Sequence, residues 1–114
     1  MGHIAIIGAG ELGGAIAHTL ARRNITPSIR LIDERGRVAD GKALDLMQAA
    51  PIEGFATALT ASASVADASG AALVVIADRA GGGEWAGDEA LQLLARLSEL
   101  TSGAVLLCAG ATQC

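Results

Sequence analysis

Three glycines near the N-terminus have the spacing of a loop that binds phosphate groups. Gly8, Gly10 and Gly13 follow a short apolar run and lead into a helical pattern, in the arrangement G-x-G-x-x-G. The first N–H groups of a helix have no partner within the helix, and its N-terminus is partly positive. The stretch therefore predicts a diphosphate site, with the backbone N–H groups near Glu11, Leu12 and Gly13 as donors.

Each glycine has a geometric reason in this interpretation. Gly8 permits a tight turn, Gly10 lets the backbone approach a diphosphate because it has no Cβ, and Gly13 lets the helix pack near a sheet. The spacing by itself is a weak motif, so its meaning depends on the rest of the chain.

A carboxylate at the end of a second apolar segment supplies the other half of such a site. Asp33 ends the segment 28–33 and lies 20 residues after Gly13. In dinucleotide-binding domains an acid at this position accepts hydrogen bonds from the adenosine ribose. The alternative is that Asp33 only caps the loop before the next helix. We favour the ribose role because the glycine loop is present.

The same region predicts which dinucleotide is bound. A 2′-phosphate beside Asp33 and Glu34 would meet charge of its own sign, which favours NAD over NADP. Arg35 and Arg37 are cations that a 2′-phosphate could use, so NADP is disfavoured without being excluded.

The elements that must position these residues alternate along the chain. Apolar strands that alternate with helices predict a parallel sheet covered on both faces. With right-handed crossovers, residues 1–114 should form a single doubly wound α/β Rossmann domain with five strands in the order 3-2-1-4-5. We expect strands at 3–8, 28–33, 55–60, 71–77 and 105–108, and helices at 11–23, 36–49 (ended by Pro51) and 85–100.

Composition excludes several other classes of protein. The chain is 52% hydrophobic with a net charge of −4, and it lacks the basic stripe of a nucleic-acid-binding protein. No apolar stretch approaches the roughly 20 residues that cross a bilayer, and no signal peptide is apparent.

An extended chain would separate Cys108 from Cys114 by about 20 Å, too far for a disulfide. We therefore expect reduced thiols and a cytoplasmic protein.

Several segments together resemble a known family. The glycine loop, Leu31-Ile32-Asp33, the stretch G-K-A-L-D-L-M-Q-A-A-P at 41–51 and Gly54-Phe55 look like the N-terminal NAD-binding domain of lactate/malate dehydrogenases. The A-L-D-L segment at 43–46 is the most discriminating piece and argues against a flavin-binding or NADP-dependent reductase. The resemblance spans about residues 3–110, leans toward the malate dehydrogenase branch and implies NAD as the cofactor.

The resemblance also implies a partner surface. In that family the helix carrying A-L-D-L lies in the dimer interface, so residues 38–50 are a candidate homo-oligomer face. The alternative is an ordinary helix packed within its own domain. Residues 105–108 are a second candidate, because an apolar edge strand must be paired or covered.

The chain departs from the family where substrate would bind. The family's T-A-G corresponds to Ala77-Asp78-Arg79, and its two arginines of the pattern R-x-P-G-x-x-R align with Gly82 and Asp88. Residues 110–112 replace the family's T-N-P. A substrate oxyanion facing Asp88 without an arginine would be repelled.

The family's catalytic His–Asp pair belongs to a C-terminal domain that this chain lacks. His3 and His18 are predicted to be structural or surface residues. We therefore predict no catalytic residue, no metal site and an NAD(H)-binding domain of a truncated or degenerate oxidoreductase without turnover on its own. The alternative is a non-catalytic interaction or oligomerisation module that has lost cofactor binding.

Overall fold

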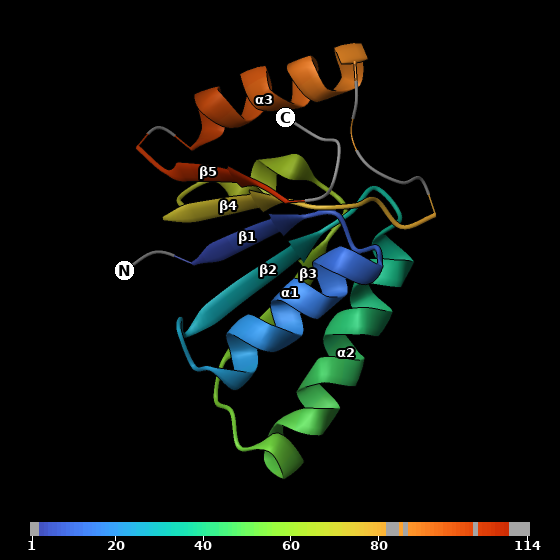
Figure 1. The fold of residues 1–114 in the computed structure, drawn as a ribbon, viewed down its shortest axis with the longest axis vertical. Coiled ribbons are helices and arrows are strands. Elements are labelled where there is room, and N and C mark those ends of the chain that lie inside the picture. The colour runs from blue at the N-terminus through green and yellow to red at the C-terminus, as the bar shows by residue number, and fades with distance from the viewer. Residues whose placement is uncertain (1–2, 82–84, 86, 102, 110–114) are drawn as a thin grey trace.

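The computed structural model describes residues 3–81, 85, 87–101 and 103–109 (Figure 1). Strands and helices alternate along these residues as the hydrophobic pattern predicts. The elements are β1 (Ile4–Ile7), α1 (Glu11–Arg22), β2 (Ser28–Ile32), α2 (Gly36–Glu53), β3 (Ala58–Ser62), the 3₁₀ helix η1 (Val65–Ala68), β4 (Leu73–Ile76), α3 (Gly87–Leu100) and β5 (Val105–Cys108).

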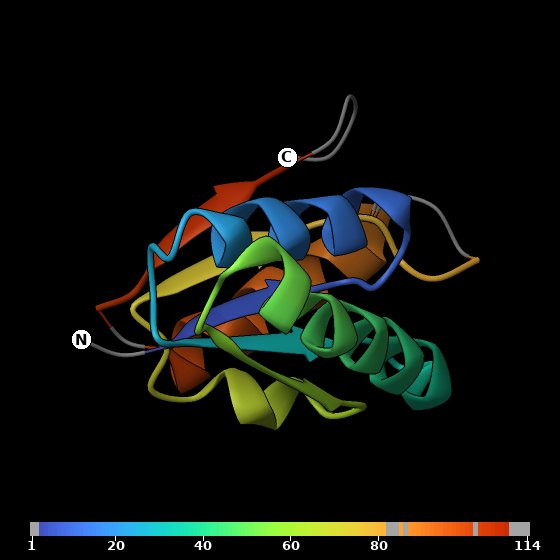
Figure 2. The same cartoon turned by 90° about the horizontal axis from the view of Figure 1, so that it is seen from below.

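The strands form one parallel sheet in the order β3-β2-β1-β4-β5, which confirms the predicted Rossmann topology. Helices α1 and α2 cover one face and α3 covers the other (Figure 1). Figure 2 shows the same arrangement from below, with α1 and α2 on the near side of the sheet. The order of the strands reverses at β1, so the loops after β1 and β4 open a crevice at the carboxyl edge.

Alternating strand residues build a separate core on each face of the sheet. In β1, Ile4 and Ile6 pack with α1 and α2, whereas Ala5 and Ile7 pack with α3. Because both faces are covered, the strand is apolar throughout rather than alternating. On α1, the small residues Ala17 and Ala21 are completely buried and allow the helix to approach the sheet.

The end of α2 and the start of β3 differ from the predictions. Helix α2 continues through Pro51 to Glu53 and ends at Gly54, which has a left-handed φ of 78° and donates its N–H to Ala50 O at 2.8 Å. A proline in the last turn removes one hydrogen bond, whereas the glycine supplies the conformation that terminates the helix. Strand β3 begins at Ala58 because pairing with β2 starts there, and Phe55 is buried in the core before it.

Strand β5 occupies its predicted place at the edge of the sheet, paired with β4. Its residues Val105 and Leu107 are 64% and 52% exposed, so this edge carries apolar side chains in contact with solvent.

Cys108 is disulfide-bonded, which corrects the expectation of a reduced thiol. That expectation assumed an extended chain after Cys108, but β5 ends at this residue. The cysteines therefore give no support to the expected cytoplasmic location.

Among the described residues, no helix has the length and apolar character needed to cross a membrane.

Candidate dinucleotide-binding site

The glycine loop connects β1 to α1 at the carboxyl edge of the sheet, as predicted. Gly8 has a φ of +116°, and a Cβ there would overlap the main chain of Asp78. A Cβ on Gly13 would overlap the carbonyl oxygen of Gly8, so the first turn of α1 lies directly against the loop. Gly10 is the N-cap of α1 and provides no side chain to bind the free N–H groups of the helix.

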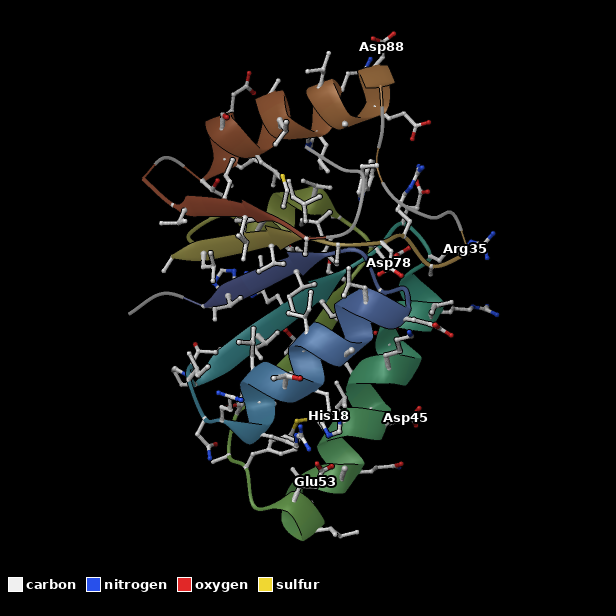
Figure 3. All side chains as sticks on the ribbon, in the orientation of Figure 1. His18, Arg35, Asp45, Glu53, Asp78 and Asp88 are labelled. Carbon is white, nitrogen blue, oxygen red and sulfur yellow. The ribbon has the colours of Figure 1, made fainter. Side chains whose placement is uncertain are left out.

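A carboxylate from the other side of the crevice binds those free N–H groups. Asp78, just after β4, accepts hydrogen bonds from Gly13 N at 2.9 Å and from Leu12 N at 3.2 Å. Figure 3 shows this side chain beside the start of α1. A Cβ on Gly10 would overlap the carboxylate, which therefore lies directly against Gly10. Two of the N–H groups predicted as donors, those of Leu12 and Gly13, thus bind an anion of the chain itself.

Asp33 reaches the same crevice from the end of β2 and is almost completely buried, with 4% of its surface exposed. Its Oδ2 accepts hydrogen bonds from Ala9 N at 2.7 Å and Ala80 N at 2.8 Å. Its Oδ1 accepts one from Arg35 N at 2.8 Å, the local turn that the alternative interpretation predicted. A carboxylate has about four acceptor positions, so three bonds leave little capacity for ribose hydroxyls.

The residues predicted to bind the cofactor do not all face the same part of the crevice. Gly8, Gly10, Leu12 and Gly13 surround the start of α1, and Asp33 joins them through the N–H of Ala9, inside the same loop. The exposed side chain of Glu11 instead lines a cleft of about 350 Å³ between α1 and α2. Its contribution to the diphosphate site would therefore come from its backbone.

The crevice is narrow beside Asp33. A cavity of about 70 Å³ lies next to Asp33 and is lined by Gly8, Glu34, Arg79 and Trp85 among others. The Arg79 guanidinium lies 4.5 Å from the centre of the Trp85 ring and also pairs with Glu89. Binding sites for small ligands usually enclose about 300 Å³ or more. The cavity beside Asp33 is smaller than this, and Arg79 and Trp85 form part of its lining.

Lys42 is a member of the site that sequence reasoning missed. Its Nζ, from α2, donates a hydrogen bond to Gly10 O at 2.8 Å and so ties α2 to the glycine loop. The same side chain packs against Gly14, where a Cβ would lie 3.2 Å from Nζ. Lys42 lies within the family-like segment 41–51, but that segment gave no indication of a contact with the loop.

Neither histidine belongs to the crevice. His18 pairs with Glu53 at 2.8 Å across α1 and α2 (Figure 3). His3 precedes β1 at the opposite edge of the sheet, and burial, with the positive charge of Arg30, lowers its pKa. Within the described residues, no three His, Cys, Asp or Glu side chains are grouped as a metal site requires. The Gly82 position and the residues 110–112 discussed above lie outside the described residues.

Known proteins are similar to this chain in sequence and in fold. The malate dehydrogenase of Thioalkalivibrio sulfidiphilus is 45% identical over 76 residues, which are 67% of this chain and 25% of the relative. The Plasmodium falciparum malate dehydrogenase in complex with NADH superposes with a TM-score of 0.77 at 24% identity, over 95% of this chain and 35% of that one.

A Cryptosporidium parvum lactate dehydrogenase, complexed with lactic acid and NAD, superposes with a TM-score of 0.73 at 27% identity, over 93% of this chain and 36% of that one. This chain thus spans about a quarter of the curated malate dehydrogenase above. Residues 2–109 match the family described as the lactate/malate dehydrogenase NAD binding domain. The chain therefore belongs to the lactate/malate dehydrogenase NAD-binding domain family.

Proposed function

We propose that this domain binds NAD(H) and has no dehydrogenase turnover on its own. The observation that carries the proposal is the convergence of the Leu12 and Gly13 N–H groups on one anionic group, the Asp78 carboxylate. The same two donors could hold a diphosphate once that carboxylate moves. Gly8, Gly10 and Gly13 keep the backbone free of side chains around that point.

Asp33 supports the proposal through the position it gives the loop. Its hydrogen bond to Ala9 N fixes the glycine loop against the end of β2, where an adenosine ribose would lie. We assign Asp33 the ribose role, with its remaining acceptor capacity as the contact. Bound NAD would supply the hydride carrier, whereas the residues of this chain hold and orient it.

Among the described residues near the crevice, we find no side chain suited to bind and polarise a substrate. Arg79, the cation nearest the family's arginine positions, is engaged by Glu89 and stacks on Trp85. Asp88, at one of those positions, is in the first turn of α3 and carries the wrong charge for an oxyanion. NADH oxidation by the 114 residues with oxaloacetate or pyruvate should therefore stay at the background rate, and turnover above it would contradict this part of the proposal.

Thermal unfolding tests whether the domain binds NAD(H). At about 100 times its dissociation constant, a ligand that binds only the folded state stabilises it by about 2.7 kcal/mol. In a domain of this size we expect NADH to raise the melting temperature by about 10 °C. NADPH is the control and should give a smaller shift, because its 2′-phosphate meets Asp33 and Glu34. An unchanged melting temperature with millimolar NADH would refute NAD(H) binding.

The second candidate function is an interaction module without a cofactor. Two observations favour it: the Asp78 carboxylate binds the diphosphate donors, and apolar side chains are exposed on α2 and β5. Leu44 on α2 is 59% exposed, and Val105 on β5 is 64% exposed. We propose that the chain forms a homo-oligomer through residues 38–50 of α2 or through the edge Val105–Cys108, with or without bound NAD.

Light scattering with two matched variants tests the α2 surface. Leu44→Lys places a charge in the proposed interface, and we expect it to weaken self-association by about tenfold or more, because the buried leucine contributes about 2 kcal/mol. Leu91→Lys is the control, since Leu91 is 65% exposed on α3, which lies across the sheet from α2. A wild-type chain that is monomeric at all concentrations, or equal effects of both variants, would reject an α2 interface.

A further inference from the structure

We propose that the Asp78 carboxylate acts as an internal competitor of the cofactor's diphosphate and thereby sets the affinity of the domain for NAD(H). This inference rests on the proposed function. It assigns Asp78 an inhibitory role at the crevice, and it predicts a lower affinity for NAD(H) than the backbone geometry of the loop alone would allow.

Asp78 binds the same N–H groups that a diphosphate would use. The two N–H groups that Asp78 binds, those of Leu12 and Gly13, belong to the first turn of α1, which has no side-chain cap of its own. They are the strongest anion-binding groups of the loop because the helix N-terminus is partly positive. A carboxylate there gains charge-assisted hydrogen bonds, which an incoming diphosphate must replace.

Asp78 cannot move away from the glycine loop. Its carbonyl oxygen accepts a hydrogen bond from Gly10 N at 3.0 Å, and a Cβ on Gly8 would overlap the same carbonyl. The backbone of Asp78 is therefore held against the glycine loop. If the side chain rotates away, its negative charge stays beside the loop, where it would repel a bound diphosphate.

Lys42 does not remove this conflict. Its Nζ donates a hydrogen bond to the carbonyl oxygen of Gly10 at 2.8 Å and is therefore engaged by the backbone of the loop. Diphosphate binding in the wild-type chain therefore has to overcome both the loss of the Asp78 hydrogen bonds and the repulsion by its charge.

Substitution of Asp78 separates these effects. Asp78→Ala removes the competitor, and we expect NADH to bind about tenfold or more tightly, because two hydrogen bonds to a charged group no longer have to be broken. Asp78→Asn keeps the shape but not the charge and should bind with intermediate affinity. Asp40→Ala is the matched control, because it removes one carboxylate from an exposed position on α2 and should leave NADH affinity unchanged.

Inorganic diphosphate provides a readout that does not depend on NAD. It should raise the melting temperature of Asp78→Ala by several degrees and leave the wild-type chain and Asp40→Ala unchanged at matched ionic strength. If Asp78→Ala does not fold, Asp78→Asn serves in both measurements, with a smaller gain.

The outcomes distinguish this inference from the proposed function. Tighter NADH binding by Asp78→Ala supports the inference even if the wild-type chain binds no NADH, a result that would reject only the proposed function. Equal NADH affinity of Asp78→Ala and wild type overturns the inference. If neither protein binds NADH, the diphosphate arm decides, and the same absence of a shift in both overturns it.

Discussion

Replacing Asp33 with alanine should lower the free energy of unfolding by about 3 kcal/mol or more. Its carboxylate accepts hydrogen bonds from the backbone N–H groups of Ala9, Ala80 and Arg35, and the first two are buried. A buried donor that loses its acceptor costs about 1–3 kcal/mol. Urea unfolding followed by circular dichroism measures the change directly.

Two further variants serve as controls for the stability of Asp33→Ala. Glu34→Ala removes the neighbouring, exposed carboxylate and should change stability by less than about 0.5 kcal/mol. Asp33→Asn keeps one acceptor oxygen and should lose roughly half as much stability as alanine. Equal stability of Asp33→Ala and Glu34→Ala would show that the carboxylate does not hold the loops together.

The stability effect changes how the ribose role must be tested. An alanine variant that loses its NADH-induced shift has lost loop geometry together with the ribose contact. Asp33→Asn is the better probe if it remains folded, because an amide oxygen at the Oδ2 position can still accept from both Ala9 N and Ala80 N. A normal NADH shift in this variant would count against a ribose contact through the charged carboxylate.

Replacing Gly13 with alanine should destabilise the domain by about 3 kcal/mol, at the upper end of the usual cost of overpacking. The new methyl group would overlap the carbonyl oxygen of Gly8, which is backbone and cannot rotate away. Relief requires α1 to move away from β1, which opens the core around Ala17 and Ala21. Thermal and urea unfolding of the variant measure the loss.

Gly41 provides the matched control for this prediction. It lies on the exposed side of α2, and a Cβ there would have no neighbour within 4 Å. Gly41→Ala should therefore stabilise the chain by about 0.5–1 kcal/mol, since alanine loses less backbone entropy in a helix. If Gly13→Ala were also neutral or stabilising, the close approach of α1 to the loop would be disproved.

The sequence contained enough information for the topology because its signals are local and repeated. Each strand is a short apolar run between helical patterns, and such alternation permits few arrangements other than a doubly wound sheet. The end of α2 was harder to predict, because Pro51 and Gly54 are both helix breakers. Only the backbone conformation shows that Gly54 provides the terminating turn.

The candidate site was predictable in its backbone and not in its side chains. The glycine spacing predicted the turn between β1 and α1, and the position of Asp33 predicted a carboxylate near that turn. The hydrogen bond from Gly13 N to Asp78, however, joins residues 65 positions apart, and the one from Lys42 to Gly10 joins residues 32 apart. Such contacts depend on how the loops face each other across the crevice, which no local pattern encodes.

The single oxygen Oδ2 of Asp33 has a dynamic consequence. It accepts the N–H groups of Ala9 and Ala80, which belong to the loops after β1 and β4. A movement of Asp33 that exposes one of these amides therefore exposes the other as well. Hydrogen exchange at these two sites should therefore report one shared opening event, in which both walls of the crevice loosen together although they are far apart in sequence.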